Sequence, residues 1–129
     1  MAHAATKELF QTVSKQDYLD ISANSSSLKQ VIVFLDFKKN DVSKATGQAK
    51  NSIRYDERMP HELKERLFEI GNIINLTASY FDGDMQKTQL WFQTKNPLLG
   101  NISPRDMIRY GRYSKLYQFI LNALAGNQP

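Results

Sequence analysis

An all-α fold is predicted by three features of the 129-residue sequence. Apolar residues recur at three- and four-residue steps, which is the spacing of one helix face. Capping residues precede several of these segments, and Gly or Pro follows them. The longest stripe, over 61–81, is long enough to join two halves of the chain. We therefore expect an N-terminal helix–turn–helix bundle (1–59), connected by this long helix to a small helical C-terminal unit (60–129).

Composition and charge narrow the class of protein. The chain has no cysteine, which excludes disulfides and thiolate metal sites. No stretch has the length of a signal peptide or membrane span, so we expect a soluble cytoplasmic protein. Residues 37–59 carry six basic and three acidic side chains, and 86–129 carry six basic and one acidic, whereas 60–85 carry two basic and five acidic. Two basic segments separated by an acidic one suggest two surfaces with different partners.

The N-terminal third, which precedes the first basic segment, contains two predicted helices. Residues 4–14 have an apolar side, and 17–23 form a connector that packs under the core. The run 24–27 offers several N-caps, and an i, i+3, i+4, i+7 pattern follows that marks an amphipathic helix with Leu28, Val31, Ile32 and Leu35 on one face.

Residues 37–55 fit a helix–turn–helix unit. Asn40 or Asp41 can cap a short helix with an apolar inner face, Gly47 can supply the sharp turn, and a second helix would bury Ile53. The first residues of such a second helix read base edges, and nearby lysines contact phosphates. The candidate DNA contacts are Lys39, Lys44, Lys50, Asn51, Ser52 and Arg54. The alternative is a helix–turn–helix that serves only as a fold.

The long helix and its two successors complete the core. Leu63, Leu67, Ile70, Ile74 and Phe81 form one stripe, and further apolar residues widen it, which favours a buried helix over a coiled-coil dimer. The segment 82–84 breaks this helix and caps the next, over 85–94, whose inward residues are expected to be Leu90 and Trp91. The last helix, over 114–125, has an inner face of Leu116, Ile120 and Leu124.

Between these last helices lies a stretch rich in residues with special backbone preferences. Asn96-Pro97 should end the preceding helix, because the residue before proline avoids the α region. Gly100-Asn101 can supply positive φ for a tight turn. Ser103 resembles an N-cap followed by Pro104 at the first helical position, and Gly111 ends the short helix that buries Met107 and Ile108.

The order of these residues resembles the C-terminal toxin-binding domain of the Xre/MbcA/ParS-type antitoxins, in which W is followed by N-P, L-G, S/T-P, an apolar pair and G-R. The matching residues are Trp91, Asn96, Pro97, Leu99, Gly100, Ser103, Pro104, Met107, Ile108, Gly111 and Arg112. Asn101 departs from the second glycine that many relatives carry. The resemblance extends over about 41–126 and is dense only from Trp91 onward.

The resemblance implies an antitoxin of a type II toxin–antitoxin system whose partner is a RES-type toxin that consumes NAD or transfers ADP-ribose from it. The C-terminal unit would cover the toxin's active site, and the N-terminal part would bind operator DNA and repress its own operon. A homodimer or a toxin–antitoxin hetero-oligomer would provide the symmetry that two DNA half-sites need. The aromatic and basic side chains expected at the toxin interface are Arg109, Tyr110, Arg112, Tyr113 and Tyr117.

Two other interpretations stay open. The chain could be a stand-alone helix–turn–helix transcriptional regulator without a toxin, or a toxin-binding module whose helix–turn–helix no longer binds DNA. An enzyme is not expected, because the sequence contains no metal-ligand spacing, nucleophile elbow or phosphate-cradling glycine loop. The only histidines are His3 and His61. We expect no cofactor and no metal.

Overall fold

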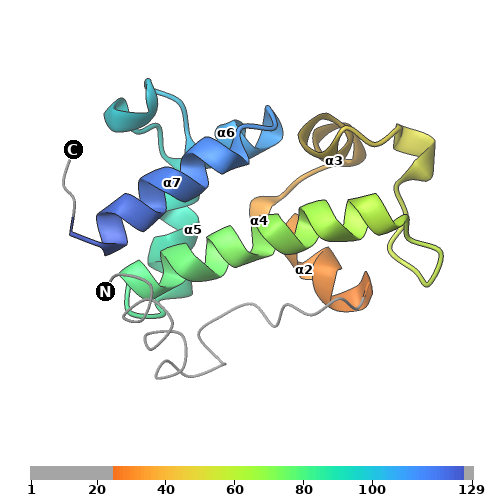
Figure 1. Ribbon diagram of the computed structural model, residues 1–129, viewed down its shortest axis with the longest axis horizontal. Coiled ribbons are helices and arrows are strands. Elements are labelled where there is room, and N and C mark those ends of the chain that lie inside the picture. Colours follow the sequence, from red (N-terminus) through yellow and green to blue (C-terminus); the bar gives the residue numbers. More distant parts are fainter. Residues whose placement is uncertain (1–24, 127–129) are drawn as a thin grey trace.

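The computed structural model describes residues 25–126, and within them every regular element is helical (Figure 1). One isolated antiparallel bridge joins Asn96 to Ile102. The predicted all-α class is thus confirmed, whereas the helix expected over 4–14 and the connector over 17–23 lie outside the described residues. The α-helices are α2 (Ser25–Leu35), α3 (Lys39–Thr46), α4 (His61–Tyr80), α5 (Met85–Gln93), α6 (Pro104–Arg109) and α7 (Tyr113–Leu124), and the 3₁₀ turns are η2 (Lys50–Ser52) and η3 (Pro97–Leu99).

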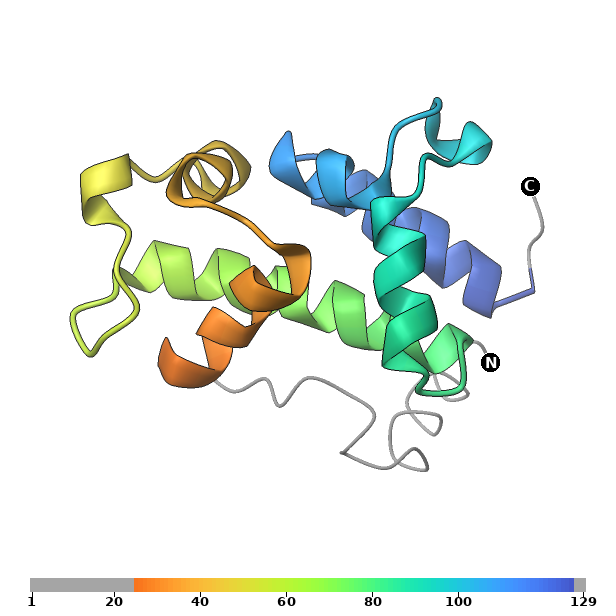
Figure 2. The same cartoon turned by 180° about the vertical axis from the view of Figure 1, so that it is seen from behind.

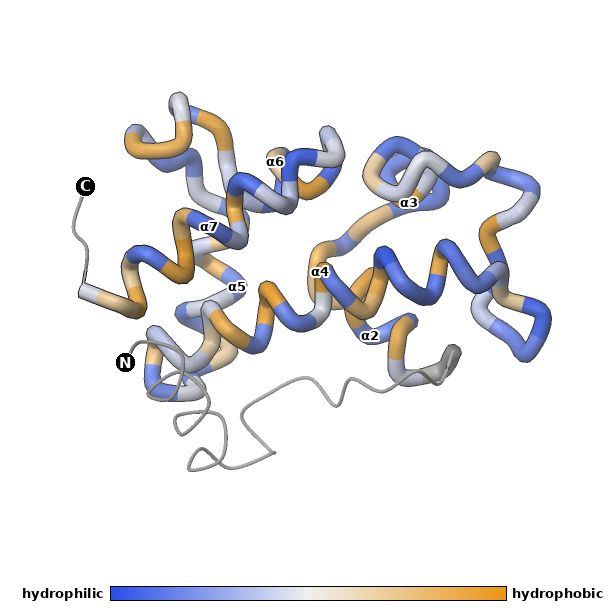
Figure 3. The backbone as a smooth tube through the Cα atoms, viewed as in Figure 1, coloured by the Kyte–Doolittle hydropathy of each residue, from blue (hydrophilic) through white to orange (hydrophobic). Residues whose placement is uncertain are grey.

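Helix α4 runs through the middle of the molecule, with α2 and α5 on one side and α7 on the other (Figures 1 and 2). Its 20 residues extend about 30 Å at 1.5 Å per residue. Apolar and polar residues alternate along it (Figure 3). Leu63, Leu67, Ile70 and Ile74 of the predicted stripe are buried, whereas Phe81 follows the end of the helix and is only partly buried. Because α4 has neighbours on two sides, Ile73 and Leu76 are buried as well, whereas Phe68 is exposed.

All six helices contribute to one continuous core. The inner faces predicted for the helices over 25–35, 39–46 and 113–124 are buried, except that Leu124 is only partly so. The largest fully buried side chain is Phe92, whose ring lies edge-on to that of Phe34 at 5.7 Å. The N-terminal part (1–59) and the C-terminal part (60–129) therefore share their apolar interior wherever the structure describes them.

The inward face of α5 differs from the one expected. Leu90 is 65% exposed and Trp91 is half-buried, whereas Thr88 and Phe92 are buried. Successive helical residues are about 100° apart, so 90, 91 and 92 cannot all face the core. Asp84 is the N-cap of the helix, and its carboxylate accepts the Lys87 N–H. The two buried residues, Thr88 and Phe92, are four positions apart and so lie on the same, inward side.

The second helix expected after Gly47 does not form. Gly47 ends α3 with φ +75°, as predicted, but only the single 3₁₀ turn η2 follows, and Ile53 is already extended at ψ 114°. Asn and Ser hydrogen-bond locally in ways that compete with the helix, and β-branched Ile disfavours it. Ile53 is nevertheless buried, as expected. The cap of α3 also differs: Lys38 is the N-cap, and the Asp41 carboxylate accepts its N–H at 2.9 Å.

Candidate partner-binding surfaces

The Asn96 side chain and backbone organise the turn after α5. Its side-chain oxygen accepts the Leu98 N–H at 2.9 Å, its carbonyl accepts the Asn101 N–H at 3.0 Å, and its own N–H donates to Ile102 at 3.1 Å. Gly100 and Asn101 both have positive φ, of 81° and 64°, which confirms the predicted tight turn. Helix α5 has already ended at Gln93. This turn projects Leu98, which is 62% exposed.

Helix α6 has the caps that the sequence predicts. Ser103 accepts the Asp106 N–H at 3.1 Å, and Pro104 occupies the first turn. At the other end Gly111 has φ +78°, and Arg112 N–H returns to the Met107 carbonyl at 2.8 Å. A Cβ on Gly111 would lie 3.7 Å from the Ala45 carbonyl oxygen, so the α6–α7 junction lies against α3.

An aromatic cluster surrounds the single tryptophan at the far end of α4. The Trp91 ring lies 5.2 Å from that of Phe92 and 6.5 Å from that of Phe81. A cavity of about 160 Å³ opens beside it, lined by Trp91 and by residues of α4, α7 and the η3 turn. Tyr80 and Leu98 line this cavity and are largely exposed. An apolar surface therefore extends from the core to the outside at this end.

Predicted DNA-contacting and toxin-contacting residues meet where α3 packs on α6. Lys44 Nζ lies 4.6 Å from the centroid of the Tyr110 ring, and the Arg109 guanidinium lies 4.7 Å from the same centroid. Arg109 also donates to the Tyr110 hydroxyl and to Asp106, at 3.0 and 3.3 Å, and lies 3.9 Å from Asp41. The hydrogen bond to Asp106 is the main reason that the pKa of Arg109 is raised.

Arg105 joins the two halves of the molecule, a role that the sequence did not reveal. Its Nε donates to the Leu35 carbonyl at 2.5 Å and its Nη2 to the Asp36 carbonyl at 2.8 Å. The guanidinium also lies 5.0 Å from the Phe37 ring centroid. These carbonyls lie at the end of α2, where backbone acceptors lack helical partners and cations are favoured. The only local sign was an Arg next to a predicted first helical turn.

Of the remaining predicted DNA-contacting residues, Lys39 begins α3 and the others lie on or beside η2. Lys39, Lys50, Asn51 and Arg54 are exposed, and Ser52 is half-exposed. Arg54 is held by Asp56 through two hydrogen bonds of 2.8 and 2.6 Å. That pairing raises the pKa of Arg54 and lowers the pKa of Asp56. An Arg54 that reads a base edge would first have to leave this carboxylate.

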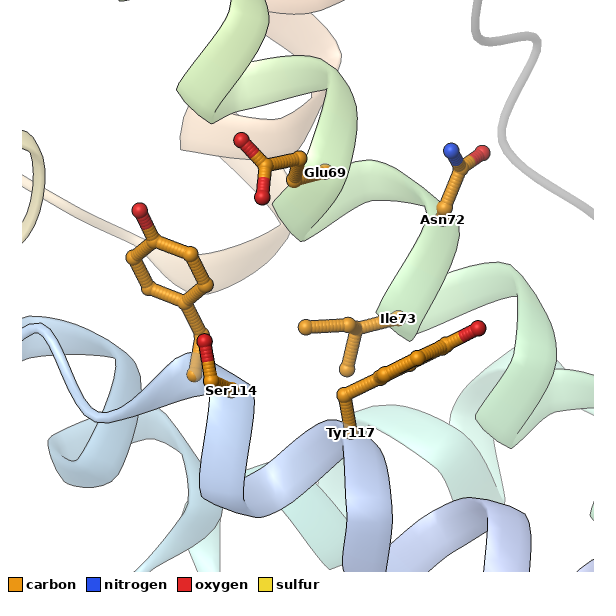
Figure 4. Close-up of a pocket in the computed structure, with 6 residues that line it drawn as sticks. Glu69, Asn72, Ile73, Ser114 and Tyr117 are labelled. Carbon is orange, nitrogen blue, oxygen red and sulfur yellow. The ribbon is translucent and has the colours of Figure 1, made fainter.

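Tyr113 and Tyr117 face a groove between α4 and α7, on a different surface from Arg109 and Tyr110. The groove has a volume of about 210 Å³. In Figure 4, Ile73 points from α4 toward Ser114 and Tyr117 of α7. Burial is the main cause that raises the pKa of Tyr113. Arg112 is exposed at the start of α7. The five predicted toxin-contacting residues are therefore divided between two surfaces.

Within residues 25–126, no group of three or more His, Asp or Glu side chains could hold a metal ion. None of the helices described is both long and apolar enough to cross a bilayer. His61 is exposed and lies 2.8 Å from Glu65, one turn further along α4.

Comparison with known protein families, with curated proteins and with solved structures found no match to this chain.

Proposed function

We propose that this protein is the antitoxin of a type II toxin–antitoxin pair and that it neutralises a RES-type, NAD-consuming or ADP-ribosylating toxin. The observation that carries the proposal is the 91–111 stretch. Asn96 and Ser103 cap, Gly100 and Gly111 adopt positive φ, and Met107 and Ile108 are buried. These residues, which match the antitoxin domain in order, thus each have their own backbone or packing role here. A match of this kind is a more specific resemblance than a similar amino-acid composition would be.

The toxin would bind the C-terminal unit and be blocked sterically. Arg112, Lys115 and Tyr117 are exposed on the first turns of α7, and Tyr80 and Leu98 are exposed at the far end of α4. Such a combination of aromatic, apolar and Arg side chains is typical of protein interfaces. A basic surface here would be attracted to an acidic rim around the toxin's nucleotide pocket.

Operator binding and autorepression form the second half of the proposal. Lys39, Lys44 and Lys50 are exposed on α3 and η2 and can contact phosphates. Because η2 is one short turn, base reading would come from an exposed loop and not from a recognition helix. A dimer or a toxin–antitoxin assembly would be needed to place two copies on two half-sites. A stand-alone transcriptional regulator is the alternative function.

Co-expression with the protein encoded by the adjacent gene tests the proposal. We expect the two chains to elute together on gel filtration and the neighbour's toxicity to disappear when this chain is present. If the two proteins elute separately, the antitoxin proposal fails. Operator binding by this chain with no toxic neighbour would instead support the stand-alone regulator.

A further inference from the structure

The groove between α4 and α7 combines features suited to a positively charged side chain. Glu69, Asn72 and Ile73 line it from α4, and Tyr113, Ser114 and Tyr117 line it from α7. Ile73 is buried, whereas Tyr117 is 39% exposed, so the groove has an apolar floor and an open, polar edge (Figure 4).

The size of the groove favours a single side chain over a metabolite. Pockets for small-molecule ligands usually enclose about 300–1,000 Å³. The volume of about 210 Å³ is below that range. One long side chain that projects from a partner's surface would fill the groove. The rest of the partner's surface would not have to enter it.

The one ionised side chain that lines the described groove is negative. It is Glu69 of α4; Glu62 and Arg66 of the same helix also act on the Tyr113 hydroxyl. Arg66 Nη1 donates to Glu69 Oε1 at 2.6 Å, and 48% of the Glu69 side chain is exposed to solvent. Tyrosine rings attract cations through their faces, and a guanidinium can bind a carboxylate with two parallel hydrogen bonds.

We propose that the α4–α7 groove receives an arginine or lysine side chain of the protein partner, with Glu69 as its counter-ion and Tyr113 and Tyr117 as its walls. The proposal rests on the proposed function for the identity of the partner, but the groove itself can be tested alone. It adds an acidic contact inside an otherwise basic interface. Alternating charges of this kind fix the register of two surfaces.

The groove is tested first with a small probe and the full-length chain. We expect N-acetyl-arginine methylamide, titrated at low salt, to shift the backbone NMR signals of Asn72, Ser114 and Tyr117. The neutral N-acetyl-norleucine methylamide should shift them much less. Equal shifts with both probes, or no shifts with the arginine probe, would overturn the proposal. Saturation by spermidine at lower concentration than by the arginine probe would make the occupant a free polyamine and would also overturn it.

Two substitutions of the same ion pair should have opposite effects. Glu69→Gln removes the counter-ion and should abolish the arginine-dependent shifts. Arg66→Gln removes a competing cation but keeps Glu69, so it should tighten probe binding. Both substitutions break the Arg66–Glu69 contact. Each therefore controls for any effect that the loss of this contact has on the stability of the fold. Glu65→Gln, on an exposed position of α4, should behave like the wild type. Weaker binding in both variants of the pair would indicate a structural effect and overturn the proposal.

The second test uses the complex with the adjacent gene product. Glu69→Gln and Tyr117→Ala should each weaken the complex about tenfold or more, mainly through faster dissociation. If the wild type forms no complex while the arginine probe still binds, the proposed function fails and the groove assignment stands. If the complex forms and both variants bind it as tightly as the wild type does, the groove assignment fails and the antitoxin proposal stands.

Discussion

Lys44 and Tyr110, which lie 66 positions apart in the sequence, are in direct contact, with the lysine Nζ 4.6 Å from the ring centroid. The first was predicted to contact DNA and the second to contact a toxin. A cation on an exposed aromatic face contributes about 0.5–1 kcal/mol. Replacement of either residue therefore changes the surroundings of the other, and variants elsewhere are better suited to separating the two proposed activities.

Operator binding is best tested at η2, away from this contact. We expect Asn51→Ala and Arg54→Ala to weaken binding to the operator by about 1–3 kcal/mol each if they contact bases. Lys50→Ala should instead lower the slope of log K against log salt by about one. Fluorescence anisotropy at several salt concentrations measures both quantities. Operator affinities equal to the wild type would remove Asn51 and Arg54 from base reading. The toxin complex, which should be unchanged, is the control.

Charge reversal at Arg112 is the cleaner test of the toxin surface. Arg112 is exposed and precedes α7, where a glutamate would interact favourably with the helix dipole. We therefore expect Arg112→Glu to stay folded and to release toxin activity, measured as growth arrest in cells that carry both genes. Lys87→Glu, at an exposed position of α5, is the matched control. Full neutralisation by Arg112→Glu would place the interface elsewhere.

Arg109→Glu combines a binding effect with a structural one. The new carboxylate would lie near Asp41 and Asp106, which now pair with the guanidinium. We expect it to lower the free energy of unfolding as well as toxin neutralisation, and urea titration separates the two. A variant as stable as the wild type would show that these carboxylates turn away from the new charge without loss.

Arg105 should be the most important charged residue for stability. Arg105→Ala leaves the Leu35 and Asp36 carbonyls without these donors, and we expect it to lower the free energy of unfolding by about 2 kcal/mol. Arg105→Lys keeps the charge but not the forked geometry, so its effect should be intermediate. Urea unfolding followed by circular dichroism measures both. A loss no larger than that of exposed Arg112→Ala would contradict this role.

Substitutions at Gly100 test how the backbone conformation alone affects stability, without a steric clash. A Cβ at this position would meet no atom within 4 Å, so the positive φ of 81° is the only obstacle to a side chain. We expect Gly100→Ala to destabilise by about 1–2 kcal/mol and Gly100→Val by more. Gly100→Asn should be tolerated better, since asparagine already adopts φ +64° at the next position. An unchanged melting temperature for Gly100→Val would show that the turn has another conformation in solution.

The Arg54–Asp56 pair predicts a local pH effect. The Arg54 hydrogen bond lowers the pKa of Asp56, so its stabilising effect is present above the unfolded-state pKa. That effect is lost as the pH falls through the lower folded-state pKa. In Arg54→Ala the pKa of Asp56 should rise toward its ordinary value, which side-chain carboxyl NMR can follow. Lys50→Ala is the control, and the same pKa in wild type and Arg54→Ala would exclude the pair in solution.

Much of the fold was predictable because its signals are local. Ser103 before Pro104, glycine at 47, 100 and 111, and the stripe along α4 each act within one or two helical turns. Where several neighbouring apolar residues could each face the core, the sequence alone did not predict which of them is buried. Leu90, Trp91 and Phe92 are consecutive and apolar, and of the three Phe92 is the one buried, with its ring edge-on to that of Phe34.

The candidate site was less predictable, because its contacts join distant segments. Arg105 reaches carbonyls 70 and 69 positions away, and no pattern around it indicates those acceptors. The aromatic and basic residues over 109–117 look contiguous in the sequence. Helical turns nevertheless direct Tyr110 toward α3 and Tyr113 toward α4. The prediction of a second helix after Gly47 was wrong, because weak helix formers without a strong apolar stripe do not form a stable helix.

The central position of α4 affects how the molecule unfolds. Since α2 packs on one part of this helix and α7 on another, around a single interior, neither end can lose its packing without exposing core side chains of the other. Domains of this size usually unfold cooperatively. A ligand bound at α7 should therefore slow amide hydrogen exchange in α2 as well, so that occupancy at one end protects backbone at the opposite end.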